Sequence, residues 1–213
     1  MSSNLLAVWK STSKSDTDVL IMPDGCRDLI MKIVEGNRPE WFVSSLYDQA
    51  KSVSIQAGSI MTGFRLKPGV YIREKALLNS IPGNLDDAHE ISNRLDDFTH
   101  HKSFVEEALD CLASEVKSVT HAASELGVSQ RTLQRLLLQE TSRPPVYWMM
   151  LARVRRTARS ILEPIPLIEI ADMFGYSDQA HMSREFKRWF NMSPSDLRNK
   201  PDILEQLFNT GHD

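Results

Sequence analysis

Two short segments of this 213-residue chain carry side chains that can read the edges of nucleic-acid bases. Arginine can donate two parallel hydrogen bonds to guanine, and glutamine can pair in a similar way with adenine. Such side chains lie on the polar faces of two predicted helices, over residues 130–140 and 179–190, and the candidate DNA-contacting residues are Gln130, Arg131, Gln134, Arg135, Gln179, Ala180, His181, Arg184 and Arg188. The chemistry expected of both segments is hydrogen bonding in a major groove.

Each of these predicted helices also has an apolar face. Leu133, Leu136 and Leu137 recur at helical spacing in the first, and Met182 and Phe186 recur in the second. Residues three and four positions apart lie on one side of a helix, so the apolar side chains are expected to pack inward. The polar residues would then be turned outward.

The same short pattern precedes both helices and would position them. A short helix ends, Gly127 or Gly175 follows, and Ser129 or Asp178 comes directly before the next helix. Glycine permits the left-handed conformation of such a turn, and a serine or aspartate side chain can cap the helix that follows. The repeat predicts two helix-turn-helix units, at about residues 119–140 and 167–190.

A single long helix is predicted between the two units, over residues 145–162. Pro145 is compatible with its first turn, and Pro164 would end it. Successive major-groove segments on one face of DNA lie roughly 34 Å apart, so two rigidly linked units could read both. One chain could therefore cover one asymmetric site.

Basic charge is concentrated in this region, although the whole chain has a formal net charge of -3. Between residues 131 and 159 the only acidic residue is Glu140, and the basic residues are Arg131, Arg135, Arg143, Arg153, Arg155, Arg156 and Arg159. Local arginines rather than net charge decide phosphate binding. The last four of these arginines have two open interpretations, contact with phosphate or pairing with acids such as Glu163.

The first part of the chain predicts a small β-rich domain. Short runs rich in β-forming residues lie at 19–22, 29–34, 41–46, 53–57, 60–66 and 70–72, with turn residues at 23–25 and 67–69. A helical connector begins near Asp86 and leads into a helix at 104–112. The predicted fold class is α+β multidomain, with a β-rich domain over residues 1–100 and an all-α domain over residues 101–213.

Four polar or sulfur-bearing residues of the first domain could line a sensing pocket: Asp24, Cys26, Asp28 and Arg65. The alternative is turn chemistry with one buried thiol at Cys26. Arg65 and Lys67 could hold an anion, or they could belong to a solvated hairpin.

Several function classes lack support in the sequence. Cys26 and Cys111 are too few for a disulfide framework or a four-cysteine zinc site, and His100 and His101 do not have zinc-ligand spacing with Cys111. No nucleophile-base pair and no glycine-rich phosphate loop stands out, so we expect no enzyme, no metal and no cofactor. The longest apolar runs are too short to cross a membrane and no signal peptide is seen, which predicts a cytoplasmic protein.

The C-terminal hundred residues resemble the DNA-binding domain of the AraC/XylS family of transcription regulators, over about residues 119–198. The second unit carries the most specific match, through Ile168, Ile170, Ala171, Gly175, Tyr176, Ser177, Asp178, Phe186, Lys187, Ser193 and Pro194. The first unit matches through Ala123, Leu126, Gly127, Val128, Ser129, Leu133, Gln134, Arg135, Pro144 and Tyr147. Residues 22–29 and 63–69 resemble motifs of a small β-domain that precedes such domains in some regulators.

The chain departs from the family pattern at a few positions. Thr141 and Asn191 stand where the family usually has glycine, and Met182 stands where it has an aromatic residue. Asn191 tolerates a left-handed conformation, whereas Thr141 does not do so easily. Leu138 is apolar for a DNA-facing helix and is expected to contact the first domain or a second subunit.

The resemblance implies a sequence-specific regulator that binds double-stranded DNA and is controlled by a signal at the first domain. RNA polymerase, a small-molecule effector and a second copy of the chain are further candidate partners. Two rivals stay open. One is a thiol-using enzyme fused to a DNA-binding domain, which would need a metal-held cysteine cluster where only Cys26 is present. The other is an interaction module that has kept the fold but lost DNA binding.

Overall fold

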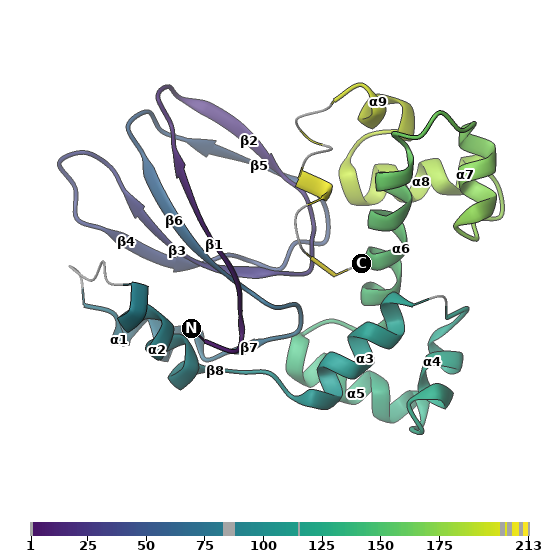
Figure 1. Ribbon diagram of the computed structural model, residues 1–213, viewed down its shortest axis with the longest axis horizontal. Helices are drawn as coiled ribbons and strands as arrows, with labels where there is room; N and C mark the ends of the chain where they lie inside the picture. Colours follow the sequence, from purple (N-terminus) through teal and green to yellow (C-terminus); the bar gives the residue numbers. More distant parts are fainter. Residues whose placement is uncertain are drawn as a thin grey trace.

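Strands and helices occupy separate parts of the molecule, as Figure 1 shows. This is a computed structural model that describes residues 2–82, 88–114, 116–200, 203, 206–208 and 211–212. Strands predominate up to residue 72, and the chain is helical from residue 103 onward apart from its connections. The predicted α+β fold class is confirmed. Asp86 and Asp87 of the predicted connector lie outside the described residues.

A four-stranded antiparallel sheet forms the centre of the N-terminal part, in the order β1-β6-β3-β4. These strands are β1 (Leu5–Thr12), β3 (Arg27–Ile33), β4 (Glu40–Val43) and β6 (Ile60–Leu66). Two further antiparallel pairs join β2 (Thr17–Ile21) to β5 (Lys51–Ile55), and β7 (Tyr71–Ile72) to β8 (Thr99–His100). The six predicted strands are present; β6 has the predicted bounds and the other five have shifted ends, whereas β1 and β8 were not predicted.

The sheet buries one face under two helices, α1 (Glu74–Ser80) and α2 (Ala88–Phe98). Leu29 and Phe64 of the sheet share a buried cluster with Leu77 of α1 and Leu95 of α2. Burying a side chain such as Leu95 contributes roughly 1.5–3 kcal/mol to the free energy of unfolding. The N-terminal part therefore has an apolar core of its own. Helix α1 was not predicted, because the chain was expected to form strands and turns up to about residue 80.

The predicted turn at Pro23-Asp24-Gly25 links two sheets rather than two paired strands. Strand β2 before it pairs with β5, and β3 after it pairs with β6 and β4. Gly25 has a φ of +79°, and an added Cβ would come within 2.9 Å of Trp148 and of His212. The turn therefore packs directly against the helical part of the chain.

The described residues of the C-terminal part form the helices α3 (Ser103–Ala113), α4 (Val119–Glu125), α5 (Gln130–Thr141), α6 (Pro145–Ser160), α7 (Leu167–Met173), α8 (Gln179–Phe190) and α9 (Pro194–Arg198). Helix α6 lies at their centre and buries Trp148, Leu151 and Val154. Pro145 occupies its first turn as expected, whereas the α-helix ends at Ser160, two residues before the predicted end. No helix in the described part of the chain is long and apolar enough to span a membrane.

The two parts share a buried interface. Met22 and Ala50 of the N-terminal part belong to the same apolar cluster as the helices. Arg155 of α6 is fully buried and donates hydrogen bonds to the carbonyl oxygens of Pro23, at 3.2 Å, and Leu207, at 3.3 Å. The backbone N–H of His212 donates to the carbonyl oxygen of Asp24 at 2.8 Å. The C-terminal residues thus connect α6 to the turn between β2 and β3.

His212 should make the folding stability depend on pH. It is buried, its ring lies 3.0 Å from the Trp148 carbonyl oxygen, and burial lowers its pKa to about 4. The unfolded chain, with an ordinary histidine pKa, then takes up this proton first as the pH falls. We expect the stability from neutral His212 to be complete above about pH 6.5 and to fall by about 3 kcal/mol towards pH 4.

The measurement is urea unfolding of wild type and His212→Phe between pH 7.5 and 4.5. Phenylalanine keeps the ring packing and does not titrate, so the stability difference should shrink steadily as the pH falls. A difference that stays constant over this range would contradict the prediction.

Candidate nucleic-acid interface

The first helix-turn-helix unit is built from α4, a tight turn and α5. The Ser118 side chain caps α4 by accepting from the backbone N–H of His121 at 3.1 Å. Gly127 has a φ of +67° in the turn, and the Ser129 side chain caps α5 by accepting from the N–H of Thr132 at 3.1 Å. The roles predicted for Gly127 and Ser129 are therefore confirmed.

The second unit repeats this arrangement with α7 and α8. Gly175 has a φ of +71°, and the Asp178 side chain caps α8 by accepting from the N–H of His181. This hydrogen bond is the largest cause that lowers the pKa of Asp178. A charged aspartate at a helix N-terminus also interacts favourably with the helix dipole. The second helix of each unit therefore begins directly after its capping residue, α5 after Ser129 and α8 after Asp178.

The apolar faces of α5 and α8 pack inward as predicted. Leu133 and Leu137 of α5 are fully buried, and so are Met182 and Phe186 of α8. Leu136 was expected among them but is only half-buried. Most of the predicted DNA-contacting residues are exposed, namely Gln130, Arg131, Gln134, Arg135, Gln179, Ala180, Arg184 and Arg188, whereas His181 is half-buried.

Two of these residues already have contacts inside their own unit. The Thr120 hydroxyl lies 3.0 Å from Oε1 of Gln130, which leaves the amide nitrogen of Gln130 for another acceptor. The backbone N–H of Ser177 lies 3.3 Å from Nδ1 of His181. A backbone N–H can only donate, so Nδ1 is the acceptor and a neutral His181 carries its proton on Nε2.

The two units superpose in sequence with an offset of 49 residues, since α5 begins at Gln130 and α8 at Gln179. Arg135 then corresponds to Arg184, and Gln134 to Ser183. The sequence left either Lys187 or Arg188 as the outward residue of α8, and both are exposed. Ser183 lies beside the polar face of α8 but was not among the predicted contacts, and the repeat itself was the signal that could have found it.

The same offset corrects one prediction about the end of α5. The left-handed residue that closes it is Ser142, with a φ of +58°, and it corresponds to Asn191, with a φ of +57°. Thr141 is the last helical residue, and its hydroxyl donates to the Leu137 carbonyl oxygen at 2.7 Å. Thr141 therefore needs no unusual conformation.

The arginines of α6 divide by face. Arg155 is fully buried against the N-terminal part, and the Nε of Arg159 donates to the Leu207 carbonyl oxygen at 2.8 Å. The guanidinium of Arg153 lies 4.5 Å from the centre of the Tyr176 ring. Glu140 does not neutralise them, because its carboxylate contacts Lys102 at 2.7 Å and His100 at 3.0 Å. Arg155 thus has a structural role, because its guanidinium donates to carbonyl groups of the N-terminal part and of the C-terminal residues.

The four candidate ligand residues of the N-terminal part do come together. The guanidinium of Arg65 contacts Asp24 at 3.0 Å and Asp28 at 3.2 Å, and the N–H of Cys26 donates to Asp24 at 2.9 Å. Burial raises the pKa of the Cys26 thiol well above its usual value, which keeps the thiol protonated. The expected solvated hairpin at Arg65 is wrong, because this side chain is enclosed between two carboxylates.

Leu138 is not buried against the first domain, one of its two expected partners, since its side chain is 52% exposed. Contact of Leu138 with a second subunit stays a prediction. It corresponds to Lys187 on α8 and lies on the outward side of α5.

These two units, joined by α6, define a double helix-turn-helix domain, and comparison with known proteins agrees. Residues 122–200 match the protein family described as "Helix-turn-helix domain". The chain is 37% identical over 82 residues to the HTH-type transcriptional activator RhaS of Escherichia coli O9:H4 (strain HS), which covers 38% of this chain and 29% of RhaS. The chain thus matches less than a third of the length of that relative.

Two solved structures are similar to this chain at low sequence identity. A transcriptional regulator with an AraC-type DNA-binding domain from Chromobacterium violaceum is 24% identical, with a TM-score of 0.42, over 51% of this chain and 95% of that one. ToxT from Vibrio cholerae is 10% identical, with a TM-score of 0.47, over 97% of this chain and 100% of that one.

Residues 122–200 therefore match a helix-turn-helix family, and this segment is similar to a transcriptional activator, in agreement with the predicted resemblance. RhaS is named as a transcriptional activator and the Chromobacterium protein as a transcriptional regulator. The name of RhaS agrees with the expectation of a transcription regulator.

Proposed function

We propose that this protein is a sequence-specific transcription regulator whose α5 and α8 enter two successive major grooves of double-stranded DNA. The observation that carries the proposal is the matched pair of capped helices, each with its apolar face buried and its arginine exposed at the same position, Arg135 and Arg184. Recognition helices read base edges from their N-terminal turns. The domains are proposed to be residues 1–100 and 101–213, acting in the cytoplasm.

The test is selection from randomised duplex DNA by the purified protein, at two salt concentrations. The expected result is a motif of two blocks with centres about one helical turn apart. Affinity should fall steeply with salt, because each phosphate contact releases counterions. If no motif is enriched and binding is independent of salt, the interaction-module rival is favoured instead.

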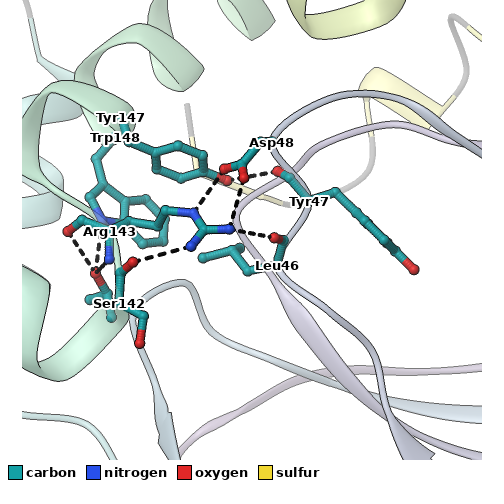
Figure 2. A network of polar contacts seen from close by, with 8 residues as sticks. Leu46, Tyr47, Asp48, Ser142, Arg143, Tyr147 and Trp148 are labelled. Carbon is teal, nitrogen blue, oxygen red and sulfur yellow. Dashed lines mark hydrogen bonds and ion pairs between the residues drawn. The ribbon is translucent and has the colours of Figure 1, made fainter.

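Control by the N-terminal part is proposed to act through the interdomain loop, residues 46–50. Figure 2 shows Arg143, just after α5, bound to this loop. Its guanidinium contacts the Asp48 carboxylate at 2.8 and 3.0 Å and the Leu46 carbonyl oxygen at 3.0 Å. The Tyr147 hydroxyl donates to the Tyr47 carbonyl oxygen at 2.9 Å. One end of the loop is therefore tied to the first unit.

The other end of the interdomain loop is tied to the second unit. The N–H of Ala50 donates to the Trp189 carbonyl oxygen at 2.7 Å, and the Asn191 side chain donates to the Ala50 carbonyl oxygen at 2.8 Å. The loop thus contacts the C-terminal ends of both proposed recognition helices. A small-molecule effector, a second copy of the chain or RNA polymerase could bias these contacts, and each is proposed as a partner on that ground.

Removing side-chain contacts at both ends of the interdomain loop should make the protein discriminate less between DNA sites that differ in the spacing of the two blocks. In the double variant Arg143→Ala, Asn191→Gly, glycine keeps the left-handed conformation that Asn191 has. Each hydrogen bond contributes about 0.5–1.5 kcal/mol, so discrimination against a spacer changed by one base pair should fall by about two- to tenfold. Binding to spacer variants measures this, with Asp18→Asn, exposed on β2, as control. An unchanged spacing preference would show that the loop does not set the geometry.

A further inference from the structure

A groove lies between the two helix-turn-helix units, on α6. Its volume is about 530 Å³, and we call it the interunit groove. Met149, Met150, Arg153 and Arg156 of α6 line its floor. Ser114, Val116 and Lys117, before α4, lie on one wall, and residues 172–175 at the end of α7 form the other. The groove therefore touches both units and the helix that joins them.

The interunit groove lies on the side from which DNA would approach. Both proposed recognition helices have their C-terminal ends at the N-terminal part, through Arg143 after α5 and Asn191 after α8. Each has 12 residues and is thus about 18 Å long, so their N-terminal ends lie well away from that interface. Gly175 in the groove wall comes four residues before α8 begins. Figure 1 shows α4 and α7 on the side of α6 that faces away from the sheets.

The charge of the interunit groove suits an anion. Among the described residues that line it, three side chains are cationic, Lys117, Arg153 and Arg156, and one is acidic, Asp172. Within the described part of the chain, none of the three forms an ion pair with a carboxylate. The Nε of Arg156 is buried and has no hydrogen-bond partner among the described residues. Because this Nε is itself buried, a phosphate in the groove would be bound by the terminal nitrogens of the Arg156 guanidinium, which is a planar set of donors that matches a phosphate.

We propose that the interunit groove binds the phosphate backbone of the DNA stretch between the two blocks, an inference that rests on the proposed function. When α5 and α8 occupy successive major grooves, the backbone between them must pass over α6. Lys117, Arg153 and Arg156 are the cations at that place. Contacts to phosphate position a protein on the duplex and carry no sequence information directly. The groove would add affinity equally on every spacer sequence.

The test compares the double variant Lys117→Gln, Arg156→Gln with Arg38→Gln, whose residue lies exposed in the turn between β3 and β4. Arg153 is left unchanged because it stacks on Tyr176. Loss of two phosphate contacts should reduce the slope of log affinity against log salt by about 1.8, since each contact contributes about 0.9. The selected motif should not change. Arg38→Gln should keep the wild-type slope.

A second arm locates the contact on the DNA. In duplexes that carry uncharged methylphosphonate linkages only between the two blocks, wild type should bind more weakly than on the ordinary duplex. The double variant, which keeps only Arg153 of the three cations, should lose less affinity than wild type on the methylphosphonate duplex. If wild type selects a motif but the double variant keeps its salt slope, the groove proposal is overturned and the proposed function stands. If wild type selects no motif at any salt concentration, both are overturned.

Discussion

Replacing Arg135 and Arg184 together with alanine is expected to lower the affinity for the selected two-block site by about 30-fold or more. Each arginine that pairs with a base edge contributes about 1–3 kcal/mol, and a loss of 1.4 kcal/mol is tenfold. The two residues lie exposed at the same position of α5 and α8, in separate units. Effects at separate sites usually add, so the double variant should lose close to the sum of the single losses.

The single variants separate base reading from phosphate contact. When the selection is repeated with Arg135→Ala, the base preferences should weaken in one block of the motif. With Arg184→Ala, they should weaken in the other block. Arg38→Ala removes an exposed charge far from both helices in sequence, and it should leave the base preferences of both blocks unchanged. Equal losses on all duplexes, with no block affected, would assign both arginines to phosphate and leave the base contacts to other residues.

The local features of this fold could be predicted because short-range patterns cause them. Gly127 and Ser129, and Gly175 and Asp178, set the start of each recognition helix within a few residues. The end of α5 was misplaced by one residue, since Thr141 and Ser142 are both polar and only the offset from the second unit distinguishes them. Strand β1 was missed because its exposed and half-buried residues do not alternate cleanly.

The interdomain contacts could not be predicted, because their partners are far apart in sequence. Arg143 bonds to Asp48, 95 positions away, and Arg155 bonds to Pro23, 132 positions away. Helical spacing shows that Arg153, Arg155 and Arg156 face different directions, but it does not show what each one meets. The same limit applies to Arg65, whose burial depends on the path of the chain through the turn before β3.

Replacing Arg155 with methionine is expected to lower the free energy of unfolding by about 3–5 kcal/mol, the range for breaking a buried charged interaction. Arg155 is fully buried, and its loss leaves the carbonyl oxygens of Pro23 and Leu207 without these donors. Asp24 would also lose a nearby positive charge that now lowers its pKa against the effect of burial. Methionine fills part of the same volume, so the loss is mainly electrostatic.

Arg156→Met is the matched control, because it is the next residue on α6 and lies half-buried in the interunit groove. Urea unfolding should show a change below about 0.5 kcal/mol for Arg156→Met, as for most substitutions away from buried networks. The two substitutions should thus change different properties. Arg155→Met should lower the stability of the contact between the two parts, whereas Arg156→Met should weaken binding to DNA. If Arg155→Met is as stable as Arg156→Met, the buried contacts with Pro23 and Leu207 do not hold the two parts together.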